Sequence, residues 1–316
     1  DFYHASHVAA ITCLSTSVLC CLGTIFYSIY LQKHGKSFRR APLINRFQVY
    51  LAIANLGFCT WHLIDHIYVI TSLSRLDESV CKFIGYMFIM TFNCLGIISC
   101  FVTFSAFIIV ILERKVVCVF LFISFWFSSI LQLKFWTFDV FLWVVGTILP
   151  ITISSIALAC GWLGFNSQWC GIRINIPIKG NLIEIIFSGL VMWINISLSL
   201  VTYGSILFKV IRSTIRVNHI KKTDKLKKIM STDNKNMAKR FVIFLMILFV
   251  QWFPLSTYLV FNSIGLKPPQ ILMTFVITFT NLGGVFTLGI FIWTRQRAAK
   301  SVGALEMKTM TTHIEK

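Results

Sequence analysis

The sequence FVQWFP occupies residues 249–254, inside an apolar run that extends from about residue 241 to residue 261. A proline in the interior of a helix removes one backbone hydrogen bond and kinks the helix, so in water it often ends one. In a bilayer, neighbouring helices and side chains can satisfy the freed carbonyl, and such prolines are tolerated. Trp252 stands two residues before Pro254, and its large ring can change rotamer as the helix bends. This stretch predicts a kinked membrane helix that acts as a moving part.

The composition of the whole chain is that of an integral membrane protein. Of its 316 residues, 57% are hydrophobic and only 13% are charged, whereas soluble domains contain about a quarter charged residues. The formal net charge of +18 could indicate a nucleic-acid partner. Most of the positive residues lie in short segments between apolar runs, however, where the positive-inside rule places them. We therefore expect a lipid bilayer around the protein and no nucleic acid.

Seven apolar runs are long enough to cross a bilayer, for which about 20 residues are needed. They cover residues 8–31, 47–73, 83–112, 136–161, 182–208, 240–262 and 270–293. The sequence thus predicts an all-α membrane protein with a seven-transmembrane helix bundle in residues 1–298. Residues 299–316 would form a short cytoplasmic tail.

The distribution of lysine and arginine predicts the orientation. The links after the first, fifth and seventh runs are basic, and the longest of them, about 209–240, holds eleven such residues from Lys209 to Arg240. The links on the other side are sparser in positive charge. The positive-inside rule then places the N-terminus outside and the C-terminus in the cytoplasm of a multi-pass protein, which we expect in the plasma membrane.

An eighth apolar run at 116–133 conflicts with this orientation. If it crossed the membrane, every later link would change sides and the basic link at 209–240 would face outward. Three explanations remain open: a re-entrant or interfacial segment, extensions of the flanking helices, or non-coding sequence retained in the gene model.

Several short patterns, in order along the chain, carry a family resemblance. Leu51–Leu56 (LAIANL) resembles the LAxADL pattern in the second helix of rhodopsin-like G-protein-coupled receptors, and Gln251–Pro254 (QWFP) is similar to their CWxP in the sixth. Tyr203 lies near the inner end of the fifth run, as a family tyrosine does. The resemblance implies a seven-helix receptor for an extracellular ligand, with a heterotrimeric G protein as partner. It also implies switch positions, at Asn55, Tyr203, Trp252 and Pro254.

The same resemblance implies a disulfide. Cys81 opens the third run and Cys170 lies between the fourth and fifth, where the family's bridged cysteines lie. Such a bridge persists in the oxidising environment outside the cell. It would tie an outer loop over the helix bundle and narrow the entrance to any pocket.

Other positions depart from the rhodopsin-like pattern. Ser105-Ala106-Phe107 stands where the family carries DRY, and Asn281-Leu282-Gly283-Gly284 is followed by no NPxxY-like proline and tyrosine. Asn55 replaces the usual aspartate. Trp169-Cys170-Gly171-Ile172 and the glycine pair also resemble the cyclic-AMP-receptor-like branch of seven-helix receptors, which is a rival family.

A polar cluster, His62, Asp65 and His66, lies near the outer end of the second run. Positions i, i+3 and i+4 share one helix face, so both imidazoles and the carboxylate can converge. Ionisable groups inside a membrane are costly and indicate function by default. Ligand contact, pH sensing by histidine, zinc binding and a simple interfacial polar cap all remain open, and we assign no metal.

Five further residues resemble the walls of the family's ligand pocket. They are Phe88 and Asn93 in the third run and Trp252, Tyr258 and Asn262 in the sixth. Ordinary helix packing, with polar groups linking helices, is the alternative for each.

The predicted function is that of a receptor that signals by helix rearrangement at the sixth run. No nucleophile motif or phosphate-binding loop is present, so we expect neither an enzyme nor a cofactor. The alternatives are a receptor-derived protein that no longer signals and a membrane transporter or channel.

Overall fold

Almost all of the described residues of this computed structural model lie in helices. The structure describes residues 2–33, 43–71, 77–111, 135–165, 169–172, 190–219, 242–243, 246–261, 266, 268–293 and 295–296. The long helices are α1 (Phe2–Lys33), α2 (Leu43–Thr71), α3 (Glu78–Ile111), α5 (Phe135–Ala159) and α7 (Leu190–His219). Further along come a helix at Met246–Phe261, then α9 (Gln270–Phe275), the π-helical segment η4 (Val276–Thr280) and a helix at Gly283–Trp293.

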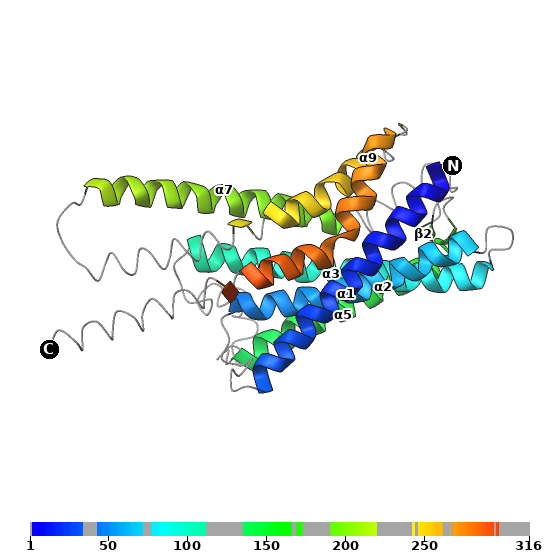
Figure 1. The fold of residues 1–316 in the computed structure, drawn as a ribbon, viewed down its shortest axis with the longest axis horizontal. Helices are drawn as coiled ribbons and strands as arrows, with labels where there is room; N and C mark the ends of the chain where they lie inside the picture. The colour runs from blue at the N-terminus through cyan, green and yellow to red at the C-terminus, as the bar shows by residue number, and fades with distance from the viewer. Residues whose placement is uncertain are drawn as a thin grey trace.

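α3 is the central element of the bundle. It packs against α2, α5 and α7, and against both short strands, while α1 packs on α2. Figure 1 shows α1 crossing the bundle at a slant and α7 running along one side of it. The main core contains Phe47, Leu51, Leu95 and Ile98 of α2 and α3, together with Trp252 of the helix at Met246–Phe261, and all five are almost completely buried.

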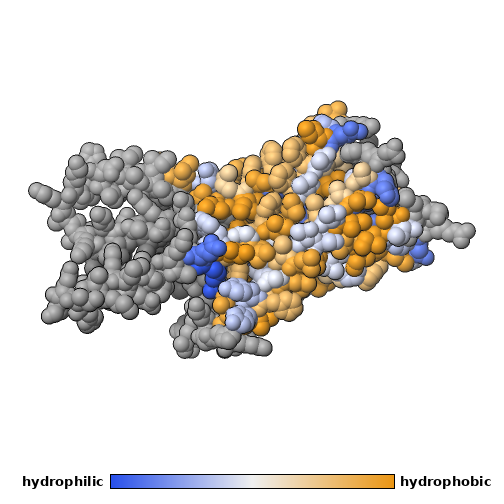
Figure 2. Space-filling view, in the orientation of Figure 1, coloured by the Kyte–Doolittle hydropathy of each residue, from blue (hydrophilic) through white to orange (hydrophobic). Residues whose placement is uncertain are grey.

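The described helices are those of a membrane-embedded protein. Four of them are long and apolar enough to cross a bilayer: His4–Leu31, Arg46–Thr71, Glu78–Ser105 and Asp139–Ala159. A fifth span is added if Gln270–Thr280 and Gly283–Trp293 are counted as one bent helix. Figure 2 shows hydrophobic side chains covering most of the described surface that faces the viewer, with hydrophilic ones gathered toward its ends.

The prediction of an all-α membrane protein is therefore confirmed, and the finer count of seven spans stays a prediction. Met246–Phe261 is apolar but shorter than a usual span. The expected fifth span at 182–208 corresponds to α7, which is described from Leu190 onward. The run at 116–133 lies outside the described residues, as does the tail at 299–316.

A small hairpin covers one end of the bundle. Its strands, β1 (Leu163–Phe165) and β2 (Cys170–Ile172), pair antiparallel, with Leu163 opposite Ile172. The predicted disulfide between Cys81 of α3 and Cys170 of β2 is present, with the two Cα atoms 5.2 Å apart. Gly85, one turn beyond Cys81, lets β2 approach closely, because a Cβ there would lie 3.2 Å from the Gly171 nitrogen. We call this end of the molecule the hairpin end.

Local sequence sets the helix ends on either side of the hairpin. α5 ends where Gly161 adopts a φ of 68°, a conformation that glycine reaches without steric cost. The Trp162 N–H then donates to the Ala157 carbonyl, and the Gly161 N–H donates to the Leu158 carbonyl, which is a Schellman ending. α3 begins after Asp77, whose Oδ1 accepts hydrogen bonds from the backbone N–H groups of Ser79 and Val80.

A bend of 49° separates Gln270–Thr280 from Gly283–Trp293. The π-helical turn of η4 precedes the bend, and such wide turns occur where a helix changes direction or carries function. The helix at Met246–Phe261, by contrast, continues through Pro254 without a break. The bend after Thr280 is thus a second candidate for a hinge, and it lies close to the predicted hinge at Pro254.

Candidate functional site

A cavity opens below the hairpin, between α2, α3, the helix at Met246–Phe261 and the α9–η4 segment. Its walls are predominantly aromatic and aliphatic, and they consist of Phe58, His62, His66, Phe88, Phe92, Trp169, Leu255, Met273, Val276, Ile277, Thr280 and Asn281. The cavity has a volume of about 50 Å³. That is room for about four water molecules.

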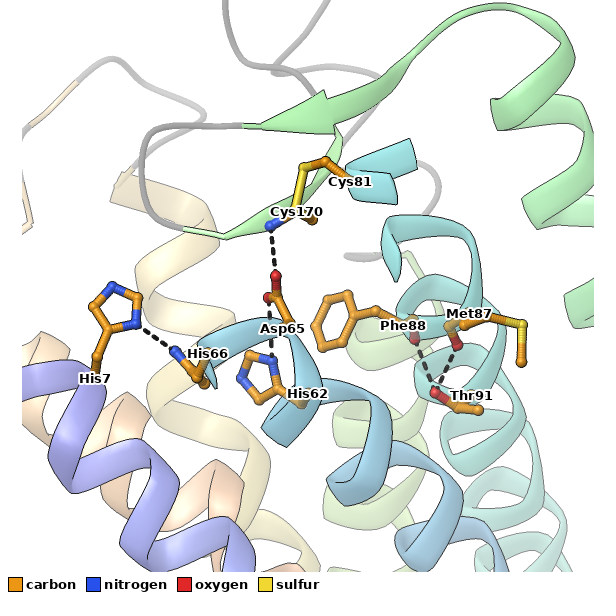
Figure 3. A network of polar contacts seen from close by, with 9 residues as sticks. All are labelled: His7, His62, Asp65, His66, Cys81, Met87, Phe88, Thr91 and Cys170. Atoms are coloured by element: carbon orange, nitrogen blue, oxygen red, sulfur yellow. Dashed lines mark hydrogen bonds and ion pairs between the residues drawn. A yellow bond between two sulfur atoms is a disulfide. The ribbon is translucent and has the colours of Figure 1, made fainter. Parts of the chain in front are cut away.

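One wall of the cavity carries the predicted polar cluster, which Figure 3 shows in detail. Asp65 is completely buried, and its Oδ1 accepts a hydrogen bond of 2.9 Å from the backbone N–H of Cys170. Its other oxygen, Oδ2, lies 3.8 Å from Nδ1 of His62. The rings of His62 and His66 lie side by side, with centroids 4.4 Å apart. The helix spacing thus brings the three side chains to one buried face of α2, as predicted.

A fourth member of the cluster, His7 of α1, was missed by the sequence analysis. Its Nδ1 lies 2.7 Å from Nδ1 of His66, and both side chains are buried. The sequence signal was a histidine near the outer end of the first apolar run. Nothing in the periodicity of either helix, however, shows which face of α1 meets α2.

Asp65 links the hairpin to α2 through its hydrogen bond with Cys170, so its replacement should lower the stability of the protein. Asp65→Ala would leave the buried N–H of Cys170 without its acceptor, at a cost of about 1–3 kcal/mol. We expect the melting temperature of the purified protein in detergent to fall by roughly 5 °C. Asp65→Asn keeps an oxygen at the same place and is expected to retain most of the stability.

Glu78→Ala is the matched control for this prediction. Glu78 forms an ion pair with Lys82 at the same end of the molecule, but its side chain is 61% exposed. Exposed pairs contribute little, so this variant should melt close to the wild type. An Asp65→Ala protein that melts no lower than Glu78→Ala would contradict the role assigned to Asp65.

Aromatic rings form the floor of the cavity and connect it with Trp252. Phe88 stacks close to His62, with centroids 4.7 Å apart, and Phe58 and Phe92 lie beyond it. The Trp252 ring contacts Phe92 at 5.6 Å and Phe58 at 6.1 Å between centroids. Trp252 is 1% exposed and its Nε1–H has no hydrogen-bond partner among the described residues.

Phe88 thus lines the cavity, whereas Asn93, Tyr258 and Trp252 lie elsewhere. Asn93 is buried in α3 and its side chain donates to the Ile89 carbonyl of its own helix. Tyr258 is buried against Trp169 at the hairpin end, with ring centroids 6.4 Å apart. Trp252 lies beneath the floor and does not line the cavity. Asn262 lies outside the described residues.

A polar layer lies next to Trp252, in the middle of the bundle. It contains Ser17 of α1, Asn55 of α2, Gln251, and Thr280, Asn281 and Thr287 around the bend. The Ser17 hydroxyl donates to the Asn281 carbonyl at 2.5 Å. The Asn55 amide donates to Thr287 at 3.3 Å, and the Thr280 hydroxyl donates to the Gln251 carbonyl at 3.4 Å.

Two glycines allow this layer to form. A Cβ on Gly283 would collide with the side chains of Asn55 and Gln251, and one on Gly284 would collide with the Ser17 backbone. Asn55 Oδ1, Gln251 Nε2 and Asn281 Oδ1 are buried without a hydrogen-bond partner among the described residues. Burying a polar atom without a hydrogen bond costs free energy. These three atoms can therefore form further hydrogen bonds if the layer rearranges.

The remaining predicted switch residues are Pro254, beside this layer, and Tyr203 of α7. Pro254 is half-buried three residues after Gln251. Tyr203 is half-buried against the main core. Neither of these two residues lines the cavity.

The end of the bundle opposite the hairpin holds a buried charged pair. Arg46 Nη2 lies 3.9 Å from Asp139 Oδ1, and both side chains are less than a tenth exposed. Tyr50, one helix turn from Arg46, packs edge-on against Trp143. In the sequence, Arg46 falls in the basic link between the first and second predicted runs, and Asp139 was overlooked. The structure instead places Arg46 in the first turn of α2, where it joins α2 to α5.

The lining of the cavity is aromatic and aliphatic apart from His62, His66, Thr280 and Asn281. Its lining contains no lysine, arginine, aspartate or glutamate, and Asp65 lies behind the histidines. Among the described residues, no group of three or more histidine, cysteine or acidic side chains has the arrangement that a metal ion requires. Neither a protein-family model nor a curated protein matches the chain.

Proposed function

We propose that the protein is a seven-helix receptor, most similar to the rhodopsin-like G-protein-coupled class, that senses an extracellular stimulus. In this proposal the hairpin end faces outward in the plasma membrane. The opposite end, with the basic links and the C-terminus, faces the cytoplasm and contacts a heterotrimeric G protein.

The observation that carries the proposal is the connection between the cavity and the bend. The cavity is partly enclosed by a hairpin that Cys81 and Asp65 both hold in place. Below it, Phe58 and Phe92 contact Trp252. Trp252 is adjacent to Gln251, whose carbonyl accepts a hydrogen bond from Thr280 next to the bend. A change in the cavity can therefore reach two helices that are able to change shape.

The mechanism is a shift between two packings of the same helices. A stimulus that moves the aromatic floor would change the rotamer of Trp252. The hinge at Pro254 and the bend after Thr280 would then move together, because the polar layer joins them. Asn55, Gln251 and Asn281 each have a buried polar atom without a partner among the described residues, so the layer can form new hydrogen bonds when it rearranges.

A G-protein dissociation assay in transfected cells tests the function. We expect tissue extracts to give a reproducible response in cells that express the protein and none in untransfected cells. Trp252→Phe should reduce this response at least tenfold, because the smaller ring loses contact with the floor. Trp193→Phe is the control, since Trp193 of α7 is 40% exposed and should signal as the wild type does.

Two results would contradict the proposal. Surface expression without any response across extracts and G-protein classes would favour a receptor-derived protein that does not signal. Extract-dependent current or uptake without G-protein dissociation would favour a transporter or channel.

A further inference from the structure

His7 of α1 and His66 of α2 form a direct contact between two helices of the bundle. Both rings are buried, at 3% and 5% exposure, and they meet edge to face with centroids 4.8 Å apart. The two Nδ1 atoms are 2.7 Å apart. At that distance they form a hydrogen bond, so one nitrogen carries a proton and the other accepts it.

Such a contact can hold a limited number of protons. Two neutral imidazoles fit, because one can donate and the other accept. One imidazolium also fits, since its charged N–H donates to the neutral partner in a charge-assisted bond. Two imidazolium rings do not fit, because both nitrogens then carry a proton and the two positive charges repel. The second proton therefore breaks the link between α1 and α2.

Among the described residues, the groups around this pair offer limited compensation for a second positive charge. On α1, His4 lies one turn away and is exposed. On α2, the neighbours are His62, itself an imidazole, and Asp65, whose Oδ1 accepts from the Cys170 N–H and whose Oδ2 lies 3.8 Å from Nδ1 of His62. The carboxylate of Asp65 thus faces His62 and not the contact between His7 and His66. α3 contributes Phe88, and β2 contributes the bridged Cys170. In the described residues of α9 and η4 that line the cavity, no side chain can ionise.

The cavity can bring water and protons to two of the histidines. It has room for about four water molecules, and both His62 and His66 lie in its wall.

We propose that this cluster is a proton-binding site, at which protonation of both His7 and His66 separates α1 from α2 at the hairpin end. The proton is then the stimulus, a step that rests on the proposed receptor function. The separation itself does not depend on signalling. Ten residues along α1, Ser17 is bonded to Asn281 at the bend, so movement of α1 reaches the polar layer.

The difference in bound protons between the open and closed arrangements sets the direction and the steepness of the pH dependence. The opened arrangement hydrates both rings and binds up to two more protons than the closed one, so acid favours opening. The ratio of open to closed protein then rises by up to about 100-fold for each unit of pH decrease. Histidine places this transition in the range of about pH 5–8.

The test measures the distance between α1 and α2 in the full chain, purified in lipid nanodiscs. Fluorophores are attached through unnatural amino acids at Ala5 and Thr71, two exposed positions at the hairpin end. We expect the distance to increase between about pH 7 and pH 5, with a proton dependence steeper than one. Constant distance over this range would overturn the proposal.

Variants of His7 and of His66 test whether these two side chains bind the protons. His66→Asn and His7→Asn keep a hydrogen-bonding atom near the position of Nδ1 but cannot gain a proton, so each should abolish the transition. Either one suffices if the other fails to give monodisperse protein. His4→Asn, on the same helix but exposed, should retain the transition. Asparagine variants that open like the wild type would overturn the assignment.

The same experiment separates this inference from the proposed function. Opening that depends on His7 and His66, without a G-protein response to acid in cells, would support the proton site and count against the receptor. A response to acid that persists in both asparagine variants would support the receptor and overturn the proton site.

Discussion

Gly284→Val is expected to prevent the bundle from forming in its described arrangement. A Cβ at Gly284 would lie 2.7 Å from Cys21 Sγ and still closer to the carbonyl oxygen of Ser17. Backbone atoms of α1 cannot move aside as the end of a flexible side chain can. Overpacking costs about 1–3 kcal/mol even where side chains can adjust, and the cost here should exceed that range.

The measurement is the yield of monodisperse protein and its melting temperature in detergent. We expect either no folded protein or a melting temperature lower by on the order of 10 °C. Gly289→Val is the matched control, because Gly289 lies on the same helix and a Cβ there meets nothing within 4 Å. Equal stability of the two valine variants would show that α1 does not pack on the bend as described.

Loss of the disulfide is expected to have the second large effect. Cys81 and Cys170 are separated by 89 residues, and in the chain-entropy model a bridge over such a loop contributes up to about 4–5 kcal/mol. Both cysteines are also buried in one small cluster with Val69 and Ile84. Cys170→Ser should therefore lower the melting temperature by about 10 °C and loosen the hairpin.

Cys160→Ser controls for the chemistry of the substitution. Cys160 is a free, exposed cysteine just after α5, so its replacement should leave melting unchanged. Cys81→Ser should resemble Cys170→Ser, because each variant removes the same bond. A reducing agent should destabilise the wild type and have no further effect on either bridge variant. Insensitivity of the wild type to reduction would contradict the stabilising role of the bridge.

The parts of the structure that sequence could predict are those that depend on one helix at a time. Apolar length predicted the long helices, and the i, i+3, i+4 spacing predicted that His62, Asp65 and His66 share a face. The disulfide followed from a family resemblance and not from spacing. Its presence in the structure agrees with an outer loop folded over the bundle.

The parts that sequence could not predict depend on how helices pack. In a membrane helix that is apolar on nearly all sides, periodicity hardly distinguishes the face toward protein from the face toward lipid. For this reason His7 could not be paired with His66. The glycine pair was noticed, but its role in packing against Ser17 and Asn55 needed coordinates.

Asp139 is a different case, because a signal for it existed. A carboxylate within an apolar run is costly and requires a partner. The partner, Arg46, lies more than ninety residues earlier in the chain. Its sequence context, beside other basic residues, suggested a solvent-exposed link.

The central claim is that the hairpin end and the C-terminus lie on opposite sides of the membrane. Its most direct test is an epitope tag at the C-terminus, stained in intact and in permeabilised cells. The account predicts staining after permeabilisation only, which agrees with seven spans and an outward-facing histidine cluster. Staining of intact cells would mean that residues 116–133 also cross the membrane, and it would contradict the receptor topology.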